Sequence, residues 1–294
     1  REVTVDTTKK TLVVHDGSQA GGTPLMRESG GGVNATINGV NIGKGANSVA
    51  GNTVLGETAL DASVSGGNNT AIGKDALTAL TSGASNVAVG SAALDANTTG
   101  GFNIGVGHTT LGANSTGSQN TGVGHGVLQE NTTASNNTGV GQNALQKNTT
   151  GASNTAVGGN ALDANTTASN NTAIGQQALT DNTTGASNTA LGVLALGNNT
   201  TADNNVAVGK HALLNNTTGT SNVAAGTNSL YANTTASNNT AIGYNSLLVN
   251  TTGTGNAAVG RQALDANTTG DYNTALGMNA LSANTTASNN TAVG

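Results

Sequence analysis

The stretch that decides the fold runs from Asn171 to Ser187 and reads NTAIGQQALTDNTTGAS. The next residue, Asn188, begins the same pattern again. An NTAIG-like segment ends in a glycine every 17 residues from Gly56 to Gly294, and no insertion breaks the count. An asparagine stands four residues before each of these glycines, and a leucine stands four residues after each one except the last. The chain is therefore built from an internal repeat.

A period that never slips indicates that each copy occupies the same place in a stack, because repeat proteins are built from units that contact only their neighbours. Seventeen residues are too few for a pair of helices, and the Gly, Asn and Thr content opposes helix formation. Val, Ile and Thr beside turn residues suit short strands. We predict an all-β fold, a β-solenoid or β-roll with one 17-residue unit per coil.

The repeat also predicts which residues form the core. The residue before each repeat glycine is aliphatic from Leu55 to Val293, and only Ala225 is not a large aliphatic residue. We expect this column and the leucine column to form two ladders inside the coil, with alanines between them in a thin interior. Two buried aliphatic side chains per coil contribute about 3 to 6 kcal/mol, less than the cost of ordering the backbone of one coil. Stability must therefore come from stacking and from burial against other chains.

Most units carry an Asn-Thr-Thr run, from residues 97–99 to 284–286. Stacked asparagine amides can form hydrogen bonds along the axis of a β stack. The same run matches an acceptor pattern for N-glycosylation. We favour the structural interpretation, in which the run forms a corner of each coil.

Composition sets limits on the class of protein. The 294 residues include 8% charged and 1% aromatic residues, one proline and no cysteine. Such a composition permits disorder, but a disordered chain has no reason to keep its aliphatic residues in phase. A net charge of −5 does not fit a nucleic-acid-binding surface. No stretch is apolar enough for membrane insertion, and disulfides do not hold the fold together.

Three segments differ in pattern. Residues 1–32 are expected to form a small β connector and attachment module, with a hairpin from residues 3–5 and 12–14, a turn at residues 15–17 and a glycine-rich joint at residues 29–32. Residues 33–51 form an irregular lead-in whose stretch 35–43 alternates like a strand pair. Residues 52–294 form the regular solenoid. The unit is interrupted at Gly294, and a solenoid needs a capped end, so we expect the natural chain to continue.

Two stretches resemble bacteriophage tail fibres. VTVDTTKKTLVVHDGSQAGGTPL at residues 3–25 is similar to the module that joins the virion-attachment region of tail fibres and tailspikes to the shaft. INGVNIGKGANSVAGNTVLG at residues 37–56 and the NTAIG, AL and NTTG repeats resemble the repetitive shafts, which are in turn similar to the β-roll heads of trimeric autotransporter adhesins. The 17-residue unit is longer than the unit of those heads.

The resemblance implies a homotrimeric fibre located in the virion. Its N-terminal end would contact other tail or baseplate proteins, and a distal region would bind a host-cell receptor or polysaccharide. The head of a bacterial cell-surface trimeric adhesin is an alternative. A remote alternative is an ice-binding solenoid, because regular threonine columns on a flat face can match a lattice.

No pattern in the repeats predicts catalysis. His108 and His125 share a column and would lie about 5 Å apart in a stack, but no carboxylate or cysteine accompanies them for a metal site. Glycines at 105–107 and 122–126 superficially resemble phosphate loops, yet no helix is expected to follow. We predict no enzyme activity, no catalytic, cofactor-binding or metal-binding residues, and no cofactor.

Most charges of the shaft lie in the variable columns that flank each leucine. They are Lys74, Asp75, Asp95, Glu130, Lys147, Asp163, Asp181, Lys210, Arg261 and Asp265. A groove for a polysaccharide or receptor is one interpretation of these columns. We favour a solvated face.

Overall fold

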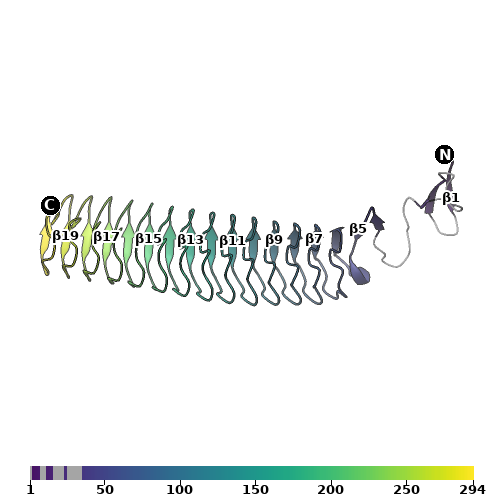
Figure 1. The fold of residues 1–294 in the computed structure, drawn as a ribbon, viewed down its shortest axis with the longest axis horizontal. Coiled ribbons are helices and arrows are strands. Elements are labelled where there is room, and N and C mark those ends of the chain that lie inside the picture. Colours follow the sequence, from purple (N-terminus) through teal and green to yellow (C-terminus); the bar gives the residue numbers. More distant parts are fainter. Residues whose placement is uncertain (1, 7–10, 16–22, 25–34) are drawn as a thin grey trace.

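The computed structural model describes residues 2–6, 11–15, 23–24 and 35–294. The expected joint at residues 29–32 and most of the expected turn at residues 15–17 lie outside these ranges. Figure 1 shows the long solenoid formed by the described residues from 35 onward.

The first three strands form a small antiparallel sheet. β1 (Glu2–Asp6) pairs with β2 (Thr11–His15), and β2 also pairs with β3 (Thr23–Pro24). Val3 lies opposite Val14 in this register. The hairpin predicted from the two valine-rich segments is confirmed.

The lead-in pairs with the first coil of the solenoid. β4 (Ala35–Ile37) and β5 (Val40–Gly43) form an antiparallel hairpin, and β5 pairs antiparallel with β6 (Thr53–Gly56). A short 3₁₀ turn, Ala46–Ser48, connects β5 to β6. The hairpin therefore covers the N-terminal edge of the parallel sheet, a place where unpaired strand groups would otherwise invite association.

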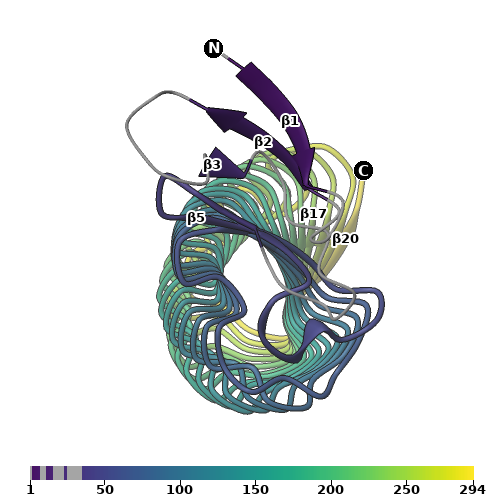
Figure 2. The same ribbon diagram turned by 90° about the vertical axis from the view of Figure 1, so that its right-hand side faces the viewer.

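The solenoid has one short strand in every coil. Each strand from β6 to β19 pairs in parallel with the same segment of the next coil, so that Thr172 lies opposite Thr189 and Ala173 opposite Ala190. Figure 2 shows the coils superimposed along the axis with a gradual turn. The predicted β-solenoid with one 17-residue unit per coil is confirmed. The remaining strands are β7 (Thr70–Ile72), β8 (Val87–Val89), β9 (Ile104–Val106), β10 (Thr121–Val123), β11 (Thr138–Val140), β12 (Thr155–Val157), β13 (Thr172–Ile174), β14 (Thr189–Leu191), β15 (Val206–Val208), β16 (Val223–Ala225), β17 (Thr240–Ile242), β18 (Ala257–Val259), β19 (Thr274–Leu276) and β20 (Thr291–Val293).

The rest of each coil is also hydrogen-bonded to its neighbours. The Leu179 amide donates to the Ala195 carbonyl at 3.0 Å, and the Thr183 amide donates to the Thr200 carbonyl at 2.9 Å. These bonds satisfy the turn backbone, which would otherwise be costly to bury. Stacking therefore supplies the partners that a single coil lacks.

The repeat glycine is required by the close approach of two coils. Gly175 has a φ of 134°, and a Cβ atom built there would lie 2.5 Å from the carbonyl oxygen of Gly192. No other residue fits this backbone contact. The glycine column is thus explained by packing between successive coils.

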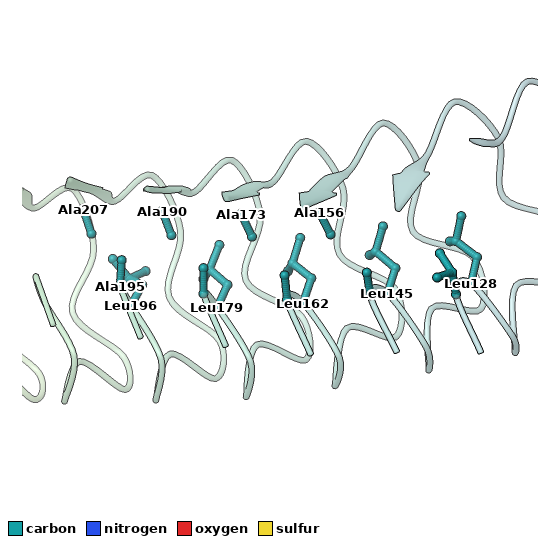
Figure 3. Packing of buried hydrophobic residues seen from close by; sticks show 14 of the residues in the cluster. Leu128, Leu145, Ala156, Leu162, Ala173, Leu179, Ala190, Ala195, Leu196 and Ala207 are labelled. Atoms are coloured by element: carbon teal, nitrogen blue, oxygen red, sulfur yellow. The ribbon is translucent and has the colours of Figure 1, made fainter. Parts of the chain in front are cut away.

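The core consists of the leucine column and an alanine-rich column on the opposite wall. Leu179 and Ala173 are fully buried, as are their equivalents in the neighbouring coils. Figure 3 shows Leu128, Leu145, Leu162, Leu179 and Leu196 in line beneath the alanines of the strands. The prediction that leucine stacks on leucine inside the coil is confirmed.

The prediction for the second aliphatic column is wrong. Ile174 is 38% exposed and Leu191 is 44% exposed, whereas the alanine before each of them is fully buried. Alternate residues of a strand point to opposite faces. Because the middle residue of each three-residue strand faces the core, the aliphatic residue before the repeat glycine faces outward.

Candidate functional surface: the outer face of the sheet

The outer face of the parallel sheet carries two columns of side chains. One column holds the first residue of each strand, and the other holds the residue before the repeat glycine. We call these two columns together the outer stripe. The most exposed aliphatic members of the stripe in the solenoid are Leu55, Ile104, Val123, Val140, Ile174, Leu191, Val208, Ile242, Leu276 and Val293.

The outer stripe is uncharged over its whole length. The first column contains Thr, Val, Ile and one Ala, and the second contains Val, Ile, Leu and one Ala. In-register pairing places Ile174 beside Leu191 and Thr172 beside Thr189. Threonine occupies most of the first column, and the exposed aliphatic side chains lie mainly in the second. Exposed apolar patches are typical of interaction sites.

Two ladders of asparagine lie inside the coil. Asn182, from an Asn-Thr-Thr run, donates through Nδ2 to Asn165 Oδ1 at 3.2 Å and to the Gly185 carbonyl at 2.9 Å. Its own Oδ1 accepts from Asn199 Nδ2 at 2.8 Å. The expected stacking of amides at this corner is confirmed. Since Asn182 is fully buried, its amide nitrogen is inaccessible to a glycosylating enzyme in the folded chain.

The second ladder is formed by the asparagine that opens each unit. Asn188 is fully buried and donates through Nδ2 to the Ala202 carbonyl at 2.8 Å. Its Oδ1 accepts from the backbone amide of Asn205 at 2.9 Å. Sequence reasoning missed the burial of this column. The signal was present, because the asparagine is as regular as the glycine that follows it.

The variable corners carry the charged residues. Lys74 Nζ lies 3.6 Å from Glu57 Oε2, and both side chains are more than half exposed, so this ion pair adds little stability. Burial raises the pKa of Asp95. Burial also raises the pKa of Asp163, and Lys147 opposes this increase. Asp95 and Asp163 lie four coils apart, so they do not form an acid and base pair.

The histidines lie on the same side of the coil as these variable corners. The rings of His108 and His125 are stacked, with centroids 5.3 Å apart and an angle of 15° between their planes. The spacing predicted from the repeat is thus confirmed. The ring centroids of His211 and Tyr231 lie 6.3 Å apart in an edge-to-face arrangement. Among the described residues, no group of three or more His, Cys, Asp or Glu side chains could hold a metal ion.

The two glycine-rich segments that superficially resemble phosphate loops belong to strands. Gly105 lies in β9 and Gly122 lies in β10. A turn follows each strand, and no helix begins there. The backbone amides of these segments bond to neighbouring coils and are not arranged to bind an anion.

The fold and the outer stripe define a β-solenoid repeat protein with an unpaired apolar face. Comparison with protein-family models, with curated proteins and with solved structures gives no match. Over the described part of the chain, no helix has the length and apolar character needed to span a bilayer.

Proposed function

We propose that this chain is the structural shaft of a bacteriophage tail fibre, and that three copies assemble through their outer stripes. The observation that carries the proposal is the aliphatic column on the outer face, whose exposed members are distributed along the solenoid from β6 to β20. A surface of this length and composition requires a partner of matching length. The sequence resemblance of residues 3–25 and 37–56 to tail fibres favours a trimer attached to the virion.

A second copy of the chain is the partner that fits the stripe best. The stripe presents one aliphatic side chain per coil, at a spacing of about 4.8 Å. A parallel copy has the same spacing, so its side chains can fill the gaps between those of the first chain along the entire length. A globular partner has no such period and would match only a few coils.

The exposed area of the stripe is comparable to that of a standard interface. The exposed fractions of its most exposed members lie mostly between 36% and 49%, which corresponds to on the order of 800 Å² of aliphatic surface per chain, the area that one partner buries in a standard interface. Association costs translational and rotational freedom, which the burial of this area must exceed. The contacts of such an interface would be apolar, because the stripe carries no charge.

The function of such a shaft is mechanical. Fifteen parallel strands, β6 to β20, span about 67 Å at about 4.8 Å per coil. In the proposed fibre, the N-terminal β-sheet contacts other tail or baseplate proteins, and the shaft projects a distal region towards a host receptor or polysaccharide. Stiffness and reach are the contribution of these residues, and catalysis is not part of the proposal.

The double substitution Ile174→Asp and Ile242→Asp is expected to convert the assembly into folded monomers. Both side chains are exposed in the single chain, at 38% and 42%, so their replacement leaves the coil intact. In the assembly, each carboxylate would be buried against apolar side chains, which is costly. Size-exclusion chromatography with light scattering measures the mass, and circular dichroism checks the fold.

The matched control places the same charges at the same spacing on another face. Thr184 and Thr252 are exposed, and Thr184→Asp with Thr252→Asp should remain a trimer. A monomeric parent chain, or an aspartate variant of the stripe that stays trimeric, would rule out the proposed interface. A monomeric parent that shows thermal hysteresis would favour the ice-binding alternative. Labelled antibodies should bind phage tails, whereas labelling of the bacterial surface would favour the adhesin alternative.

A further inference from the structure

The stacked histidine pair is a feature that the proposed shaft does not explain. His108 follows β9 and His125 follows β10, so the two residues occupy the same position in adjacent coils. Their rings lie 5.3 Å apart and nearly parallel. Both side chains are exposed. A metal ion in solution can therefore reach both imidazoles.

The backbone fixes the distance between the two histidines. The His108 carbonyl accepts from the Gly126 amide at 3.1 Å, and the His125 carbonyl accepts from the Asn143 amide at 3.0 Å. These bonds hold three successive coils in register on this side of the solenoid. The histidine backbones are thus already in place, and only side-chain rotation is needed to bring two ring nitrogens together.

The ring nitrogens are available as ligands. Thr109 Oγ1 lies 3.5 Å from His108 Nδ1 and donates to the His108 carbonyl at 2.8 Å. Within the described residues, Nε2 of neither ring has a hydrogen-bond partner. A metal ion binds an imidazole nitrogen at about 2.0 to 2.1 Å, in the plane of the ring. Because the two rings are nearly parallel, both exposed side chains must rotate about χ1 and χ2 before their Nε2 atoms point to one ion.

We propose that His108 and His125 together bind one divalent transition-metal ion, with water completing its coordination. Imidazole suits Cu²⁺, Ni²⁺ and Zn²⁺, and Cu²⁺ binds most strongly among these ions. The neighbouring residues of the same column, Ser91 and Gln142, add no charge that would repel a cation. The proposal rests on a single chain and does not depend on the assembly of the shaft.

Isothermal titration of the full chain with CuCl₂ tests the site. We expect one ion per chain at the pair, and we expect His125→Gln or His108→Gln to weaken binding by about 10- to 100-fold, because binding through a second tethered ligand is lost. Glutamine already occupies this column at Gln142, so the coil accepts it. Electron paramagnetic resonance of the copper-loaded chain should show two nitrogen ligands that become one in either variant.

His211→Gln is the matched control. This histidine lies in a different column, beside Tyr231, and its replacement should leave the affinity for Cu²⁺ unchanged. His15 is present in every variant and contributes equally to all titrations. If each histidine of the pair binds copper independently, or if His125→Gln binds as tightly as the parent chain, the shared site does not exist. Circular dichroism of each variant confirms that the coil is intact.

Discussion

Leu179→Asp is expected to disrupt the solenoid around its coil and to abolish a single cooperative melting transition. Leu179 is fully buried between the leucines of the adjacent coils (Figure 3). Removing its side chain leaves a cavity that costs about 2 to 5 kcal/mol, and an unpaired buried carboxylate adds several kcal/mol more. Stability in a repeat array depends on contacts between nearest neighbours. One such defect therefore separates the coils before it from the coils after it.

Hydrogen exchange followed by mass spectrometry would locate the effect. The backbone amides should lose their protection against exchange first in the coils that contain Leu162, Leu179 and Leu196. Thr184→Asp introduces the same charge into the same coil at an exposed position, and it should change stability by no more than about 0.5 kcal/mol. If Leu179→Asp melts like the parent chain, the leucine column does not form the core.

The architecture of this protein could be predicted from its sequence because one period governs nearly the whole chain. A repeat without insertions requires every unit to have the same conformation, and only stacking satisfies the backbone of such short units. The leucine column, the stacked amides of the Asn-Thr-Thr corner and the first two hairpins follow from local patterns. The burial of the leucines, the pairing of the hairpin strands and the hydrogen bonds between the amides confirm these three features.

The face of the strand could not be predicted from hydrophobicity alone. In the segment Thr172–Ile174, either the alanine or its two neighbours must face the core, and hydrophobicity favours the isoleucine. The buried asparagine decides the matter, because Asn171 and Ala173 share one face of the strand. The thin interior also favours alanine over isoleucine on the inner face. A Cβ atom at Gly105, in the alanine column, would lie only 3.4 Å from Leu94 Cδ1, so a larger side chain there would displace the leucine.

The inward orientation of the alanine, in place of the larger aliphatic residue, determines where the proposed interaction surface lies. The sequence predicts that the coils need burial against other chains, but it places the aliphatic residues inside and leaves the contact face unassigned. Once the alanines occupy the interior, the column that includes Ile174 becomes the exposed apolar face. The position of the proposed interaction surface therefore follows from the alternation of the strand and could not be derived from composition or period.

Asn188→Asp is expected to destabilise the folded chain by about 3 to 5 kcal/mol at neutral pH, although it changes the shape of the side chain very little. The substitution removes the two donors of Nδ2, so the Ala202 carbonyl loses the hydrogen bond from residue 188 at 2.8 Å and keeps only the one from Asn199 Nδ2 at 3.1 Å. The new oxygen would lie beside Asn171 Oδ1, which is an acceptor. Two acceptors in contact repel each other, and burial of a carboxylate adds a desolvation cost.

The pH dependence of this variant distinguishes the buried ladder from a simple surface effect. Burial raises the pKa of the introduced carboxyl group above its value in the unfolded chain. The destabilisation should therefore be largest at pH values above the folded pKa and should decrease as acidification protonates the group. Asn170→Asp is the matched control, because Asn170 is exposed and adjacent in sequence to Asn171, the ladder residue of the preceding coil. Thermal melting of both variants and the parent chain, at neutral and acidic pH, measures the difference. Equal melting temperatures for the two variants at neutral pH would show that the amide ladder does not stabilise the stack, whereas a loss confined to Asn188→Asp would show that the buried amides hold successive coils in register.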